Sequence, residues 1–360
     1  MLYYIDKKYN FVEFFNTENG TLVRSNIIKN GIETNLEPHM RSFPELIDIG
    51  IMGTCHAGQT GVCKNAGVDC YQNAPNNCKA NMSLGKYKSL LCQCESKTFQ
   101  VALGGAGDPN KHENFEEILK ATRECNIVPN LTTSGYDLTD YEIKLMKDYC
   151  GAVAISFYSK LAKSSRETNH STITAIERLV SAGCVTNIHY VLSNKSIDEA
   201  IYRLENNLFP KEINAIIFLL YKPVGLASKE NMLTAKDERY IKFLKLATNV
   251  NNGYKIGFDS CQTPAILNFC NSVARESLEF CEASRFSMYI DCDMKAYPCS
   301  FGHNNQKYSV DLNNHSIDEA WNSEFFNLFR EKQKLQCNDC KEDGCRNCAL
   351  DLGVAVCGKL

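Results

Sequence analysis

The sequence predicts an α/β fold, a partial or full (β/α) barrel of the TIM type with a small cysteine-rich C-terminal extension. From residue 46 onward, short apolar runs alternate with amphipathic stretches, which is the pattern of repeated βα units. Beyond residue 258 the alternation stops and cysteines recur at short intervals. We therefore expect an N-terminal β-hairpin segment at 1–45, the barrel at 46–260 and the extension at 261–360.

Turn signals open the chain, with Asn-Gly-Thr at 19–21 and Lys-Asn-Gly at 29–31, and they indicate a small β-hairpin. Seven apolar runs then predict the barrel strands, at residues 46–52, 98–103, 127–131, 152–157, 185–191, 215–220 and 254–258. Apolar residues at helical spacing predict the clearest helices, at 115–124, 141–149, 171–182, 197–206 and 237–248. In the extension we expect a hairpin with strands at 286–290 and 296–298, followed by a helix at 316–334. Right-handed crossovers place the functional loops at the carboxyl ends of the parallel strands.

The composition narrows the classes of function. The 360 residues include 19 cysteines, an odd and clustered set, and no apolar signal segment opens the chain. Metal ligation therefore explains the cysteines better than a disulfide scaffold does. No run of about 18 apolar residues is present, so we expect a cytoplasmic protein without a membrane partner. The formal charge of −3, with basic residues spread among acidic ones, argues against a nucleic-acid partner.

A glycine-rich loop with three cysteines follows the first predicted strand. Cys55, Cys63 and Cys70 have the spacing C-x7-C-x6-C, and Cys78 follows as a further candidate ligand. Glycines let the backbone approach a cluster, and three thiolates leave one iron open to bind a cofactor or substrate. Zinc is the alternative, but structural zinc sites favour cysteines about two to four residues apart, and this loop has none.

This loop and its neighbours resemble the radical S-adenosylmethionine superfamily, in which a C-x3-C-x2-C loop after the first strand holds a 4Fe-4S cluster. The gaps are wider here, so the resemblance rests on position and on nearby motifs. Cys70 is followed by Tyr71, as in the family. The second strand ends in Gly-Gly-Ala-Gly-Asp-Pro at 104–109, which looks like an expanded GGEP motif, the part of the family's fold that contacts the cofactor's methionine amino group.

The third strand ends in Thr-Thr-Ser-Gly at 132–135, where the family often has Thr-Asn-Gly, and Pro-Val-Gly at 223–225 matches a Pro-x-Gly turn common after the sixth strand. Ser156 and Asn187 fall where the family places contacts to the cofactor's carboxylate and ribose. Tight turns and helix caps are the alternative interpretation of these residues. The cofactor-binding residues that the resemblance implies are Gly104, Gly105, Asp108, Pro109, Thr133, Ser134, Ser156 and Asn187.

The extension holds the densest group of cysteines, with C-x2-C-x4-C-x2-C at 337–348. Binding a metal offsets the cost of crowding four thiolates. A zinc ribbon would use these four and leave Cys281, Cys299 and Cys357 without a role. The stretch resembles the SPASM extension of peptide-modifying radical enzymes, which holds one or two auxiliary 4Fe-4S clusters. The resemblance implies one set of Cys337, Cys340, Cys345 and Cys357 and a second of Cys281, Cys299 and Cys348, which lacks a fourth ligand. Cys261 is the first choice for that ligand, and Cys270 and Cys292 are the alternatives.

The resemblance also implies a function. The cluster at Cys55, Cys63 and Cys70 would reductively cleave S-adenosylmethionine to a 5′-deoxyadenosyl radical, which abstracts hydrogen from a substrate held in the barrel away from water. A peptide or protein side chain is the first expected substrate and a small metabolite the second. The third alternative is a non-catalytic iron-sulfur or zinc protein. An electron-donating reductase such as flavodoxin or ferredoxin is the expected partner, and Asp259, at a strand end, is the candidate base.

Overall fold

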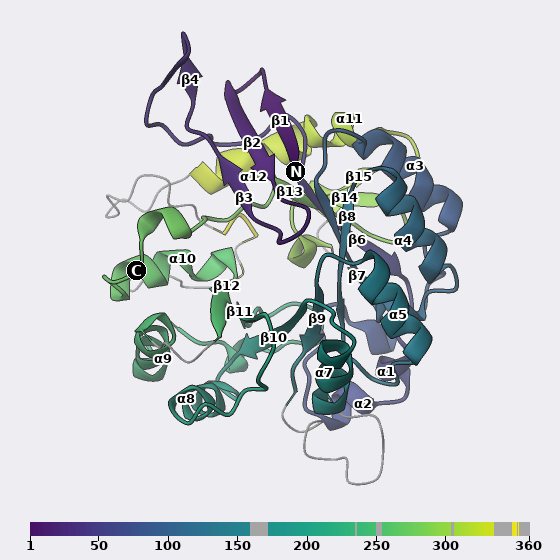
Figure 1. Cartoon of the computed structure of the whole chain (residues 1–360), viewed down its shortest axis with the longest axis vertical. Helices are drawn as coiled ribbons and strands as arrows, with labels where there is room; N and C mark the ends of the chain where they lie inside the picture. Colours follow the sequence, from purple (N-terminus) through teal and green to yellow (C-terminus); the bar gives the residue numbers. More distant parts are fainter. Residues whose placement is uncertain are drawn as a thin grey trace.

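The computed structural model describes residues 1–158, 172–234, 236–249, 254–303, 306–334, 348–350 and 352. Seven parallel strands lie side by side in the order β12-β11-β10-β9-β8-β7-β6, which confirms the predicted α/β fold (Figure 1). Each lies within two residues of its predicted bounds. These strands are β6 (Leu46–Met52), β7 (Gln100–Gly105), β8 (Val128–Thr133), β9 (Val153–Ser156), β10 (Thr186–Leu192), β11 (Ala215–Leu220) and β12 (Lys255–Phe258).

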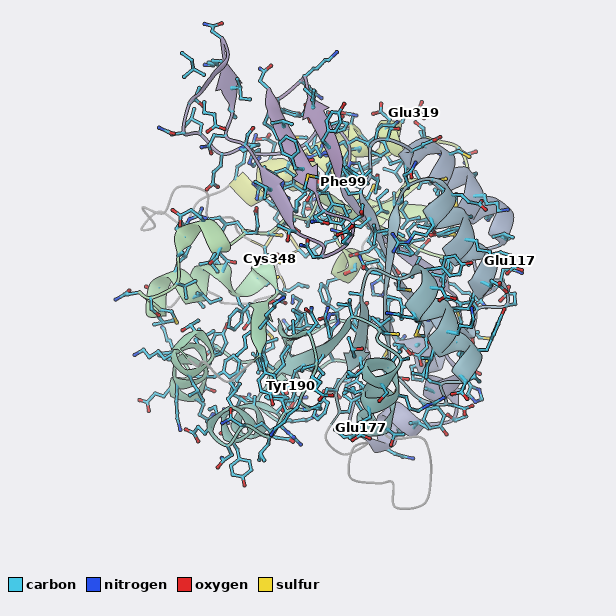
Figure 2. The ribbon with its side chains drawn as sticks, viewed as in Figure 1. Phe99, Glu117, Glu177, Tyr190, Glu319 and Cys348 are labelled. Atoms are coloured by element: carbon cyan, nitrogen blue, oxygen red, sulfur yellow. The ribbon has the colours of Figure 1, made fainter. Side chains whose placement is uncertain are left out.

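Helices alternate with these strands and cover the outer face of the sheet (Figure 1). Their apolar faces pack on the strands, whereas Glu117, on the outer side of α4, is exposed (Figure 2). The five predicted helices are present, and a sixth, α3, precedes β7. The helices are α3 (Leu84–Cys94), α4 (Phe115–Glu124), α5 (Asp140–Tyr149), α7 (Thr172–Ser181), α8 (Ile197–Glu205) and α9 (Glu238–Asn249).

Side chains alternate between the two faces of each strand. In β10, Ile188 and Tyr190 are buried against the helices, whereas Asn187, His189 and Val191, between and beside them, retain some exposure. The same alternation holds in β7 and β8, whose interior positions carry small or polar side chains. The inner face of the sheet is therefore a partly open, polar surface and not a second apolar core.

The hairpin predicted in the extension is present and joins the barrel's own sheet. β13 (Ser287–Ile290) pairs in parallel with β6, and β14 (Lys295–Tyr297) and β15 (Val310–Asp311) continue the sheet antiparallel. In the described part of the chain, β12 and β15 are its two edges, so the barrel is partial. The extension is thereby attached directly to the strand that leads into the cysteine loop.

The single helix predicted at 316–334 is wrong, because two helices occupy this stretch. α11 (Ile317–Trp321) ends at Asn322, and α12 (Glu324–Lys334) begins after Ser323, whose Oγ accepts a hydrogen bond from the Phe326 N–H. A serine hydroxyl that binds a free N–H in this way starts a new helix. α10 (Thr263–Phe269), which the sequence analysis missed, follows β12.

The N-terminal residues form a three-stranded antiparallel sheet of β1 (Leu2–Asp6), β2 (Phe11–Phe15) and β3 (Leu22–Arg24), and a small hairpin of β4 (Ile28–Lys29) and β5 (Ile32–Glu33). Both predicted turns are therefore present. Among the described residues, no helix has the length and apolar character needed to span a membrane.

Candidate functional site

The cysteine loop leaves the carboxyl end of β6 through two one-turn helices. Cys55 is the N-cap of α1 (His56–Gln59), and its Sγ accepts a hydrogen bond from the Gly58 N–H at 3.1 Å. Cys63 lies in α2 (Val62–Asn65), and Cys70 lies in the segment after it. All three thiols are partly exposed. Such backbone N–H groups on ligand sulfurs are one of the means by which proteins tune iron-sulfur clusters.

The three thiols influence one another's charge. Burial raises the pKa of Cys55, and the negative charges of Asp108 and Cys70 raise it further. Burial likewise raises the pKa of Cys63 to about 12, with added contributions from Cys55, Asp108 and Cys70. The thiolates therefore repel one another unless a cationic centre lies between them, and this donor set fits a metal cluster. Within the described ranges, no three His, Cys, Asp or Glu side chains are close enough to hold a single metal ion.

Neighbouring loops pack closely on the cysteine loop because glycines remove the Cβ that would block them. A Cβ on Gly107 would collide with the backbone oxygen of Thr54, and one on Gly225 would collide with that of Tyr71. Gly225 also has φ +68°, a conformation that other residues rarely adopt. The structure thus brings the Gly-Gly-Ala-Gly-Asp-Pro loop and the Pro-Val-Gly turn against the cysteine loop.

Asp69, which the sequence analysis did not single out as a functional residue, anchors the loop next to Cys70. Its Oδ2 accepts hydrogen bonds from the Tyr221 hydroxyl (2.9 Å) and from Asn231 Nδ2 (3.0 Å), and lies 3.3 Å from the Lys195 ammonium. Tyr221 and Asn231 follow β11 and Lys195 follows β10, so the segments after two strands fix one carboxylate. No local signal in the sequence identifies such an anchor, since its partners are more than 100 residues away.

The implied cofactor residues at the ends of β7 and β8 contact each other. The Asp108 carboxylate accepts hydrogen bonds from the N–H and the hydroxyl of Ser134, both at 2.6 Å. Thr133 is buried, and its Oγ1 accepts from the Gly135 N–H at 3.2 Å. Pro109 is buried and begins the 3₁₀ turn after this loop. Asp108 is therefore already engaged within the chain.

Open space lies in front of one glycine of this loop. A Cβ on Gly104 would meet no atom within 4 Å, whereas one on the adjacent Gly105, which has φ +115°, would press on the backbone of Met52. Gly105 is thus required by the close approach of β6, and Gly104 leaves room on the inner face.

Ser156 and Asn187 have different positions in the barrel. Ser156 is the last residue of β9 and forms a hydrogen bond with Tyr158, whose pKa is raised by burial and by Cys63. Asn187 is the second residue of β10, and its Oδ1 accepts from Asn214 Nδ2 at 2.8 Å. The structure therefore does not bring Asn187 to the carboxyl end of its strand. The strand register places His189 beside Ser156 instead.

Two ionisable residues that the sequence analysis left without a role face the interior. Burial lowers the pKa of His189 to about 4, so its ring is neutral, and Nδ1 lies 3.4 Å from Thr132 Oγ1. Burial, with the charge of Glu282, raises the pKa of Asp48 in β6 to about 7. The polar Asp48 interrupts an apolar run, Leu-Ile-Asp-Ile-Gly-Ile-Met, and this interruption is the feature of the sequence that could have identified Asp48 as a candidate functional residue.

Cys261 follows the end of β12, and it lies near cysteines of the extension that influence one another's charge. Burial raises the pKa of Cys299 to about 12, and Cys281 and Cys348 raise it further. Burial also raises the pKa of Cys261, with contributions from Cys281 and Cys299. Cys261 and Cys348 therefore each lie near Cys281 and Cys299, and the ligand set that includes Cys261 stays a prediction. Cys348 lies away from the α4 side of the barrel, which Glu117 marks (Figure 2).

The alternatives to Cys261 lie elsewhere. Cys270 ends α10 and packs against the apolar core, and Cys292 lies in the β13–β14 turn beside Asp291 and Asp293. Cys78 is exposed, with Gln59 Nε2 at 3.9 Å from its sulfur. The remaining implied cluster ligands, Cys337, Cys340, Cys345 and Cys357, lie outside the described residues.

The candidate base Asp259 is held by three partners. Its Oδ2 accepts from the Lys222 ammonium (2.6 Å) and the Leu220 N–H (3.1 Å), and its Oδ1 accepts from Gln262 Nε2 (3.0 Å). Both carboxylate oxygens are thus engaged within the chain. A carboxylate paired in this way has a clear structural role between β11 and β12.

Comparisons with known proteins agree with this arrangement. Residues 281–349 match SPASM, an iron-sulfur cluster-binding domain. Streptococcus suis SuiB bound to S-adenosylmethionine has a similar fold, with a TM-score of 0.60 and 16% identity over 88% of this chain and 72% of that one. The structure of SuiB bound to the precursor peptide SuiA has a TM-score of 0.63 and 14% identity, over 91% of this chain and 89% of that one.

The structure of native anSMEcpe with bound AdoMet and the Cp18Cys peptide is also similar. Its TM-score is 0.56, and its identity is 16% over 83% of this chain and 86% of that one. Curated protein sequences gave no match. Residues 281–349 are therefore similar to an iron-sulfur cluster-binding domain of the SPASM family, and the chain has a fold similar to that of SuiB and anSMEcpe.

Proposed function

We propose that the chain is a radical S-adenosylmethionine enzyme that modifies a peptide or protein side chain. The observation that carries the proposal is the joint presence of two thiol groups on one fold. Cys55, Cys63 and Cys70 lie beyond β6, and the second group, which includes Cys281 and Cys299, lies in the matched SPASM domain. A purely structural zinc protein has no need of an open, glycine-lined loop beside a barrel interior.

The residues divide into those that bind the cofactors and those that enclose the substrate. Cys55, Cys63 and Cys70 would hold the first cluster, and the open face at Gly104 would admit S-adenosylmethionine. When bound, these groups supply a 5′-deoxyadenosyl radical that abstracts hydrogen from the substrate. Thr133 and Ser156 lie at the same ends of their strands and would orient the cofactor. The remaining barrel wall excludes water from the substrate.

A peptide is the substrate class that we favour. Two of the proteins that share this fold have been observed with peptides bound, SuiA in SuiB and Cp18Cys in anSMEcpe. The inner face of the sheet carries polar side chains, His189 and Asp48 among them, and such a surface suits a backbone rich in hydrogen-bonding groups. We further propose that a flavodoxin- or ferredoxin-type reductase supplies the electron.

The test is anaerobic reconstitution followed by assay for 5′-deoxyadenosine after addition of dithionite and S-adenosylmethionine. Wild-type protein should form the product. Cys55→Ala, Cys63→Ala and Cys70→Ala should each abolish it and lower the iron content. Cys92→Ala is the matched control, because Cys92 is exposed on α3 and belongs to neither thiol group.

Two results would contradict the proposal. Iron binding without any 5′-deoxyadenosine, under several reductants, would indicate an electron-transfer or structural protein, and a colourless, zinc-loaded preparation would indicate the latter. Product that forms only with small metabolites, and not with peptides, would retain the reaction class and overturn the substrate class.

A further inference from the structure

Lys222 is a buried lysine in the turn that follows β11. Only 5% of its surface is exposed, and a buried ammonium must find hydrogen-bond partners to offset its lost hydration. Its Nζ donates to Asp259 Oδ2 at 2.6 Å and to the Leu220 carbonyl at 2.9 Å, and it lies 4.6 Å from the centre of the Phe301 ring. These contacts hold a positive charge at one defined place.

The partners of Lys222 belong to the two segments that carry auxiliary thiols. Asp259 is the N-cap of the 3₁₀ turn Ser260–Gln262, which contains Cys261. Phe301 lies in the 3₁₀ turn Ser300–Gly302, whose N-cap is Cys299. The ammonium therefore lies between the segment of Cys261 and the segment of Cys299, and neither thiol segment is its neighbour in sequence.

The ammonium faces both thiol segments at short range. Its partner Asp259 is two residues from Cys261, and the Phe301 ring that it approaches is two residues from Cys299. Since the lysine is buried, salt screens its field much less than it screens the field of surface charges.

We propose that Lys222 is a positioning residue that sets the reduction potential of a cluster held by Cys261, Cys281, Cys299 and Cys348, with Asp259 moderating its charge. The inference rests on the proposed function. A cluster held there would take one electron from the flavodoxin- or ferredoxin-type reductase, and its net charge would become more negative by one. A fixed cation beside it stabilises the reduced form and makes the cluster easier to reduce.

The experiment is a redox titration of the reconstituted full-length protein, followed by electron paramagnetic resonance. Lys222→Met should shift the midpoint of this cluster to lower potential, and Asp259→Asn should shift it to higher potential. Lys222→Arg, which keeps the charge, should stay close to wild type. Each shift should be on the order of tenfold in the reduction equilibrium, equivalent to about 59 mV for one electron.

The opposite signs separate this inference from a structural role. Lys222→Met and Asp259→Asn both break the same ion pair, so a purely structural role would move both midpoints in one direction or neither. Either of those results would overturn the inference. If Lys222→Met fails to hold iron, the Asp259→Asn shift decides alone: an upward shift supports the inference, and no shift or a downward shift overturns it.

Failure of the proposed function gives a different result. The resonance signal that disappears in Cys281→Ala identifies the cluster under study. If wild-type protein shows no such signal, the auxiliary cluster is absent and this inference fails, whereas the formation of 5′-deoxyadenosine still decides the proposed function. If the signal is present and its potential does not respond to Lys222 or Asp259, only the inference fails.

Discussion

Replacing Arg24 with methionine should destabilise the protein strongly, and more so at alkaline pH. Arg24 lies at the end of β3 with 10% of its side chain exposed, and its guanidinium contacts four carboxylates. The separations are 3.2 Å to Glu13, 2.5 Å to Glu45, 2.5 Å to Glu279 and 3.4 Å to Glu282. The first two carboxylates are buried. Glu13 keeps its ion pair with Arg41 at 2.6 Å, so the substitution mainly leaves Glu45 in the interior without its cation.

The magnitude follows from the burial of this network. Removing one partner of a buried ion pair costs about 3 to 5 kcal/mol, because the remaining charge is neither hydrated nor paired. Unfolding entropy is about 2.1 cal/mol/K per residue, or roughly 0.75 kcal/mol/K for 360 residues. A loss of about 4 kcal/mol therefore corresponds to a fall of about 5 °C in Tm.

The pH dependence provides the sharper test. The ordinary pKa of a glutamate is about 4.3, and burial raises the pKa of Glu45 to about 8. The positive charge of Arg24 opposes this rise. A carboxyl whose pKa rises on folding contributes stability at acidic pH and loses that contribution as pH rises through its folded pKa. Without Arg24 the pKa of Glu45 rises further. The variant should therefore lose little at pH 6, where Glu45 is protonated, and most at pH 9.

Urea unfolding at pH 6 and pH 9, followed by circular dichroism, measures both effects. Lys144→Met is the matched control, since Lys144 forms an exposed pair with Asp148 on α5 and should cost less than about 1 kcal/mol at either pH. A loss below about 1 kcal/mol for Arg24→Met at pH 9, or an equal loss at both pH values, would refute this account of the network.

Three further variants test the site. Asp69→Ala removes the anchor beside the third loop cysteine, so iron bound by the core cluster should fall while the auxiliary resonance signal persists; equal loss of both would contradict the anchor role. Gly225→Ala should cost more than Gly20→Ala in urea unfolding, because both have positive φ (+68° and +75°) but only Gly225 meets backbone atoms. Equal costs would show that contact with the cysteine loop is unimportant. Cys94→Ser, in the core, should lose about 1 to 3 kcal/mol without loss of iron, whereas the exposed Cys92→Ser should change neither; iron loss in Cys94→Ser would make it a ligand.

Local patterns were sufficient for most elements of the barrel. α4 lies at its predicted bounds because Phe115, Ile118, Leu119 and Thr122 recur at helical spacing and form one buried face. β11 also matches its predicted bounds, as a continuous apolar run between two polar segments. The break between α11 and α12 was missed, because a serine that caps a new helix and a serine within a helix look alike until the hydrogen bond is seen.

The sequence by itself determined the order of βα units, the two turns at the N-terminal end and the cysteine spacings, because each depends on residues close together in the chain. The tertiary structure alone decided that β13 extends the barrel sheet beside β6, that His189 and not Asn187 lies next to Ser156, and that Lys222 lies between the segments of Cys261 and Cys299. Strand register and packing between segments far apart in the chain set these contacts, and no local periodicity encodes them.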